Sequence, residues 1–153
     1  MKKTVQVVIP DNITKIDDDV FLNTTITSVE IPDSVTTIGD NAFAGCEYLT
    51  EVTVPDSVTK IGDNVFYGCT SLESATWESR EGIGDGTFAE CAGLTDLSIS
   101  KELPSIGKEA FFYCQNLKQI TIPAKTTKIG NNVFGSCDHL ETINVAAGNT
   151  IYR

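Results

Sequence analysis

The five cysteines of this sequence are candidates for metal binding or disulfide formation. They recur about 23 residues apart, at Cys46, Cys69, Cys91, Cys114 and Cys137. Zinc sites usually need closely paired ligands such as C-x-x-C, and an odd number of cysteines cannot all form disulfides within one chain. Cysteine is also a small residue that is readily buried. We therefore predict a column of buried, reduced thiols and no metal site.

The single histidine, His139, follows Ser136, Cys137 and Asp138, and this run superficially offers a nucleophile, an acid and a base. A catalytic triad needs such groups to converge from separate elements of the fold. General-base chemistry at neutral pH has almost no other candidate, because the sequence contains no second histidine. We predict that His139 lies exposed in a loop, and that the protein is not an enzyme and needs no cofactor.

Acidic and amide side chains recur at another position and could build calcium sites between repeats. They are Asp17-Asp18-Asp19, Asp40-Asn41, Asp63-Asn64 and Asn131-Asn132. Calcium needs several converging oxygens, but the same position also holds Lys108-Glu109. We predict instead that these residues cap short helical turns. The run from Gly82 to Gly86 mimics a phosphate-binding loop, but no P-loop lysine follows it.

A repeat of 22 or 23 residues positions all of these groups. Its clearest marks are Phe21, Phe43, Phe66, Phe88, Phe111 and Phe134. An isoleucine comes five residues before each phenylalanine, and in five repeats a leucine comes six residues after it. Seven short alternating runs, from Val7-x-Ile9 to Ile143-x-Val145, predict half-buried strands, and proline ends four of them. Repeats of this length cannot bury their apolar side alone, so they must stack.

The predicted fold is an α/β, β-rich solenoid that forms a single domain over residues 1–153. We expect about seven coils, a concave parallel sheet, short strands on the opposite wall and single helical turns on the convex side. The first repeat is one residue short and has Thr24 in place of a cysteine, so we expect a distorted coil there. The fourth is also one residue short, between Trp77 and Ile83, which predicts a bulge or kink.

Composition excludes several classes of protein. The apolar fraction of 41% is too high for a disordered chain, and no run approaches the 18 apolar residues of a membrane span. The formal net charge of −10 repels phosphate backbones, so we expect no nucleic-acid partner. The first residues lack the long apolar run of a secretory signal, so we expect either a cytosolic protein or one whose signal was removed before this chain was made.

The repeat I-P-x-x-V-x-x-I-G-x-x-A-F-x-x-C-x-x-L-x-x-V-x-[IV], most complete from Ile31 to Val54, resembles the BspA-like leucine-rich repeat of bacterial and some protist surface proteins. The resemblance extends from about Val7 to Val145. It implies a curved solenoid, an extracellular or cell-surface location, and adhesion or protein binding, with a host matrix protein or a neighbouring-cell protein as the expected partner, usually within a longer secreted parent. The family has no shared catalytic residues to transfer to this sequence.

Neither end of the sequence carries the polar cap that a solenoid needs. Val5, Val7 and Ile9 begin almost at the first residue, and residues 148–153 resemble the start of another coil. We therefore expect a fragment of a longer array, whose uncapped ends could stack end to end with another copy.

The outward side chains of the long strands form the candidate binding surface, a polar, hydroxyl-rich and mildly acidic strip. The selected residues are Glu30, Glu51, Thr53, Thr76, Asp96, Ser98, Gln119, Thr121 and Asn144. Concave solenoid walls are common recognition surfaces, so we predict a non-catalytic protein-interaction or adhesion module. A rigid spacer with no ligand of its own is the alternative. Tyr67 and Tyr113 are predicted to lie off this strip and could anchor a partner on the convex side.

Overall fold

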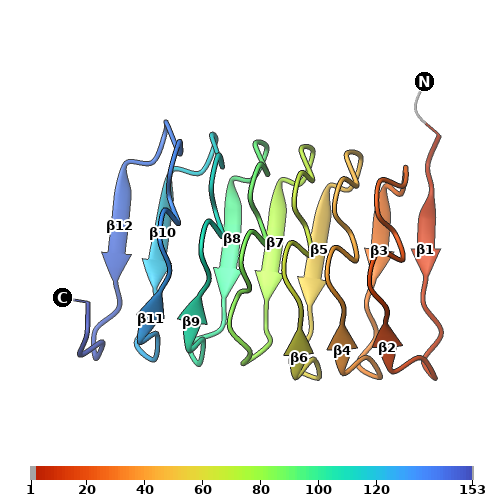
Figure 1. Cartoon of the computed structure of the whole chain (residues 1–153), viewed down its shortest axis with the longest axis horizontal. Helices are drawn as coiled ribbons and strands as arrows, with labels where there is room; N and C mark the ends of the chain where they lie inside the picture. The colour runs from red at the N-terminus through yellow and green to blue at the C-terminus, as the bar shows by residue number, and fades with distance from the viewer. Residues whose placement is uncertain (1–2, 153) are drawn as a thin grey trace.

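The computed structural model describes residues 3–152, which wind into a flattened solenoid (Figure 1). One wall consists of longer strands: β1 (Gln6–Val8), β3 (Ser28–Glu30), β5 (Glu51–Val54), β7 (Ser74–Trp77), β8 (Asp96–Ile99), β10 (Gln119–Ile122) and β12 (Thr142–Val145). The opposite wall contains two-residue strands: β2 (Lys15–Ile16), β4 (Thr37–Ile38), β6 (Lys60–Ile61), β9 (Ser105–Ile106) and β11 (Lys128–Ile129). Figure 1 shows the two sets running in opposite directions.

Strand pairing is parallel throughout the described residues, because each coil returns the chain to its starting direction. On the long-strand wall the hydrogen-bonded groups are β1-β3, β5-β7-β8 and β10-β12. On the opposite wall they are β2-β4-β6 and β9-β11. Equivalent repeat positions face each other: Val52 pairs with Ala75, and Ala75 pairs with Leu97. The predicted parallel solenoid is confirmed.

The segment around each phenylalanine is not helical, so the predicted helical turns are wrong. Residues two before and two after the phenylalanine have left-handed φ angles, such as 57° at Asn41 and 70° at Gly45. A right-handed helix cannot contain these angles. The backbone N–H groups of Asn41, Phe43 and Gly45 donate to carbonyls of the next coil, and those of Ala44 and Cys46 donate three residues back. The result is a pair of tight turns stacked from coil to coil.

The solenoid has about six coils, so the prediction of about seven is wrong. Each complete coil runs from a long strand through one phenylalanine turn, and the last of these turns contains Phe134. After β12 no further phenylalanine turn follows among the described residues. Seven long strands therefore delimit six coils.

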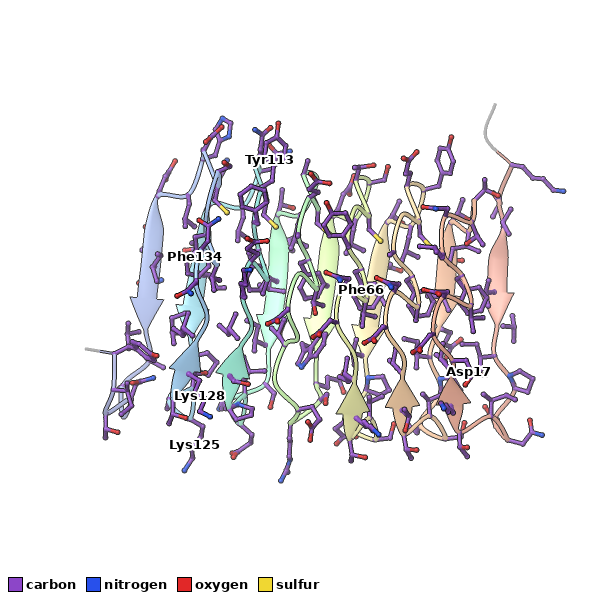
Figure 2. The ribbon with its side chains drawn as sticks, viewed as in Figure 1. Asp17, Phe66, Tyr113, Lys125, Lys128 and Phe134 are labelled. Carbon is purple, nitrogen blue, oxygen red and sulfur yellow. The ribbon has the colours of Figure 1, made fainter. Side chains whose placement is uncertain are left out.

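Stacked phenylalanine rings fill the core between the walls. Successive ring centroids lie 5.2, 5.4, 5.5, 5.5 and 6.0 Å apart from Phe21 to Phe134, with interplanar angles of 13° or less. Figure 2 shows Phe66 and Phe134 at mid-height of their coils. Trp77 packs edge-on against Phe88, with 5.9 Å between the centroids. Such aromatic pairs add to the free energy gained from burying apolar area.

The cysteines form a ladder of thiol hydrogen bonds beside the rings. Each Sγ donates to the carbonyl of the phenylalanine in the preceding coil, at 3.0 to 3.2 Å. None of the five is in a disulfide, four are buried and Cys137 is half-buried, which confirms the predicted column of buried thiols. In the first coil the Thr24 hydroxyl donates to the Phe21 carbonyl at 2.8 Å. The strands of that coil pair in regular register with those of the second coil.

The aspartates before the phenylalanine turns cap the neighbouring coil rather than a helix. Oδ1 of Asp40 accepts the N–H of Asp63 at 2.7 Å, and Asp18, Asp63 and Asp85 make the equivalent bond. This position is crowded: a Cβ added to Gly62 would lie 2.7 Å from the Asp40 nitrogen. The repeat therefore requires a glycine in the next coil at the point where it packs against each such aspartate.

The fourth coil interrupts the short-strand wall, where the sequence predicts a bulge or kink. Ile83 makes only an isolated bridge with Ile106, whereas β5, β7 and β8 remain paired on the other wall. Ser79, fully buried, replaces an apolar residue. Its Oγ donates to the Val58 carbonyl at 2.7 Å and accepts the Glu81 N–H at 3.0 Å.

Removing a ring from the middle of the phenylalanine stack should destabilise the fold most. We expect Phe66→Ala to lower the free energy of unfolding by about 3–5 kcal/mol, because it leaves a large cavity between two rings. Phe134→Ala should cost less, since Phe134 is only half-buried. Urea titrations measure both, with exposed Thr53→Ala as the control. Equal losses for Phe66→Ala and Phe134→Ala would contradict this account.

The buried thiols should make the free energy of unfolding decrease at alkaline pH. Burial raises the pKa of the Cys91 thiol well above its ordinary value of 9.0. The folded protein therefore retains a proton that the unfolded chain releases above that value. Stability from this thiol is complete below pH 9 and falls by up to about 1.4 kcal/mol per pH unit above it. Urea titrations from pH 7 to 10.5 should show that the free energy of unfolding declines less steeply with pH in Cys91→Ala than in the unmodified protein. Equal slopes for the two proteins would refute this prediction.

Candidate functional site

The outward side chains of the seven long strands form one surface, which we call the sheet face. Strand register places Glu51, Ser74 and Asp96 in one row and Thr53, Thr76 and Ser98 in the next. Gln119 and Thr121 lie in matching positions on β10, Asn144 pairs with Thr121, and Glu30 pairs with Val8. The structure thus brings all nine predicted residues to the same face.

The nine side chains are largely exposed and, within the described chain, make no hydrogen bond or ion pair that supports the fold. Eight of the nine are exposed and Thr76 is half-exposed, whereas the alternate residues Val52 and Val54 are 5% and 1% exposed. Among the described residues, none of the nine side chains has a hydrogen bond or ion pair to another protein group. Strand alternation accounts for this arrangement, because every second side chain points away from the core. The face can therefore change composition without loss of the fold.

The sheet face contains three hollows. The first, of 520 Å³, covers outward residues of β1, β3, β5 and β7. The second, of 240 Å³, lies over β7, β8 and Gln119 of β10. The third, of 520 Å³, lies between β8, β10 and the segment after β12.

Charge differs between the ends of this face. The first hollow is lined by the carboxylates of Glu30, Asp33, Glu51 and Glu78 and by no lysine or arginine. The third contains Lys101 and no carboxylate. Sequence analysis missed Asp33, Glu78 and Lys101, because they lie in the turns after the strands. Their position within two residues after an alternating run was the signal that could have found them.

His139 does not form a catalytic site with its sequence neighbours. Its exposed ring places Nδ1 2.7 Å from the Gln115 carbonyl oxygen, and the Cys137 thiol instead donates to Phe111. Asp138 accepts a hydrogen bond from the Gln115 amide. Residues 3–152 contain no group of three or more histidine, cysteine, aspartate or glutamate side chains that could hold a metal ion.

Tyr67 and Tyr113 lie on the phenylalanine turns, away from the sheet face, as predicted. Each is 41% exposed, and Figure 2 shows Tyr113 at the edge of the solenoid. A hydrogen bond with Glu90 raises the pKa of Tyr67, and burial and nearby acidic charge add to this shift. Tyr113 contacts Phe112, with ring centroids 6.3 Å apart. The described part of the chain has no helix of the length and hydropathy that a membrane span requires.

Comparison with solved structures finds similar bacterial proteins. The chain is 26% identical to a leucine-rich repeat protein from Bacteroides ovatus, with a TM-score of 0.70, over 94% of this chain and 43% of that one. It is 33% identical to a leucine rich cell surface protein from Faecalibacterium prausnitzii, with a TM-score of 0.62, over 94% and 48% of the two chains. The chain thus spans less than half the length of each of these structures.

A protein from Eubacterium ventriosum, 24% identical over 88% of this chain and 43% of that one, shares the fold with a TM-score of 0.70. No curated protein sequence matches the chain significantly. The model of the BspA type leucine rich repeat region matches six copies, over residues 1–89 and 81–152. The chain therefore belongs to the BspA-type leucine-rich repeat family.

Proposed function

We propose that this protein is a non-catalytic adhesion module that binds another protein through the sheet face. The observation that carries the proposal is the set of nine polar side chains, aligned in rows and unused by the fold. Surfaces that repeat along a solenoid are common recognition surfaces. Leucine-rich repeat proteins are generally interaction or structural modules, and their fold is typically non-enzymatic.

The proposed setting is a cell-surface or secreted bacterial protein. The 33% identity to a leucine rich cell surface protein from Faecalibacterium prausnitzii supports this location. We further propose that residues 1–153 form one solenoid domain within a longer array, since the matched region covers less than half of each similar structure. Ile143 and Val145 are 49% and 40% exposed at the last coil. Another coil, from the same protein or from a second copy stacked end to end, would cover them.

A rigid spacer is the second candidate function. The stacked rings and the backbone hydrogen bonds between the phenylalanine turns join every coil to the next. Such a solenoid would resist bending and could hold another domain away from a surface. In this case the polar side chains of the sheet face serve only to keep it solvated.

Binding to immobilised fibronectin, fibrinogen, collagen and mucin separates these functions. We expect saturable binding to at least one of them, weakened tenfold or more by Thr53→Lys, Thr76→Lys and Thr121→Lys together, because the bulky cations block the face. The control carries Thr37→Lys, Thr59→Lys and Thr127→Lys on the opposite wall. Full binding by the sheet-face variant would contradict the proposed site. Binding to none of these proteins would favour the spacer.

A further inference from the structure

The three hollows of the sheet face lie side by side in one row, which we call the groove. The first and second share Ser74 and Thr76, and the second and third share Leu97 and Gln119. The groove therefore crosses the strands from β1 to the segment after β12. A bound chain would lie across the strands, along the axis of the solenoid in Figure 1.

One end of the groove suits positive charge. Glu30 and Glu51 are exposed on adjacent strands, and Asp33 and Glu78 approach from the turns. None of these four carboxylates has a salt bridge among the described residues. Lysine or arginine side chains of a partner could therefore pair with them without displacing an internal cation.

The opposite end suits an apolar group beside a negative charge. Leu97 and Ile99 are half-buried, whereas Ile120 and Ile122 at the same positions of β10 are 4% and 2% exposed. The exposure arises where β8 and β10 belong to separate hydrogen-bonded groups. Lys101 lines this hollow and has no ion pair within residues 3–152. Apolar walls with a few polar groups are typical of ligand pockets.

The groove has the dimensions of a short extended peptide. β3 and β10 lie four strand positions apart, and paired strands are spaced by about 4.8 Å, so the span is at least roughly 19 Å; it is longer where β3 and β5, and β8 and β10, are not hydrogen-bonded. An extended chain advances about 3.3 Å per residue, so at least roughly six residues are needed to cover this span. The smaller middle hollow is lined by Ser74, Thr76 and Ser98, which leave room for small side chains, and by the carboxylate of Asp96 at the start of β8, at the other end of that strand from Lys101.

We propose that the groove binds one extended segment of a partner protein that carries opposite charges at its two ends. Lysine or arginine lies over β3 and β5, and an apolar residue next to a carboxylate lies over β8 and β10. The inference rests on the proposed function, because it uses the same face, and it adds the chemistry and order of the partner's residues. A fatty acid would interact only with the end that contains Lys101, and a polybasic segment would interact only with the end lined by carboxylates.

Two peptides of identical composition test this order of charges. Acetyl-KKSGSGLE-amide separates the basic end from the apolar, acidic end, and acetyl-EKSGSGLK-amide exchanges one lysine with the glutamate. Each is also made in reversed sequence, because the groove does not dictate chain direction. In 50 mM NaCl we expect the first arrangement, in its forward or its reversed sequence, to bind about fivefold more tightly than the second arrangement. Amide NMR shifts should appear in β5 and β10 together, and salt at 500 mM should reduce the preference.

Charge-reversal variants supply a matched test. Glu51→Lys and Lys101→Glu change exposed residues, and amide spectra verify that each remains folded. Each substitution should weaken binding of the first peptide about fivefold. Lys101→Glu should also shift the protein's preference toward the peptide that ends in Leu-Lys. Structural damage would not produce this exchange of preference. Lys128→Glu, on β11 of the opposite wall (Figure 2), should change binding less than twofold.

Equal affinities of the two arrangements, or shifts confined to one hollow, would overturn this inference. The proposed function would still stand if the sheet-face lysine variant lost binding to matrix proteins or mucin. Conversely, full protein binding by that variant would refute the proposed function even if the peptides showed the expected order.

Discussion

Backbone hydrogen bonds between successive coils set the spacing to which the other parts of the solenoid conform. On the phenylalanine turns, alternate N–H groups donate to the next coil and the intervening groups donate within their own coil. The left-handed residues make this alternation geometrically feasible. With the coils held at this spacing, the phenylalanine rings stack, each aspartate reaches the next backbone and each thiol reaches a phenylalanine carbonyl. The repeated phenylalanine, aspartate and cysteine residues therefore all depend on the same distance between successive coils.

The same spacing gives the sheet face its character. Outward residues must appear in rows, one per strand, because the register is parallel and regular. Specificity then depends on how a row changes along the solenoid rather than on any single side chain. Here the rows change from carboxylates near β3 and β5 to hydroxyls near β7, then to Asp96 at the start of β8, and to apolar groups with Lys101 between β8 and β10.

Repeat period and residue type were enough to predict the strands, their parallel order, the buried thiols and the rows of the sheet face. These features follow from burial, which sequence periodicity reports directly. The phenylalanine turns were misjudged because Phe43 and Cys46, three residues apart, fit one helical turn as well as two tight turns. Asn41 and Gly45 indicated left-handed angles, but Glu109 and Tyr113 adopt the same angles without that signal. The hollows depend on where strand pairing lapses, which the repeat period does not reveal, and on residues such as Lys101 just after the strands, which were left out because only the strands themselves were considered.

The fourth coil has a consequence for how such proteins can change. Its missing residue is absorbed on the short-strand wall, where buried Ser79 and the isolated bridge of Ile83 replace regular pairing. The register from β5 to β8 passes through this coil undisturbed. A deletion on one wall is therefore not transmitted to the other. Repeats can gain or lose single residues over evolutionary time while the groups that face a partner keep their relative positions.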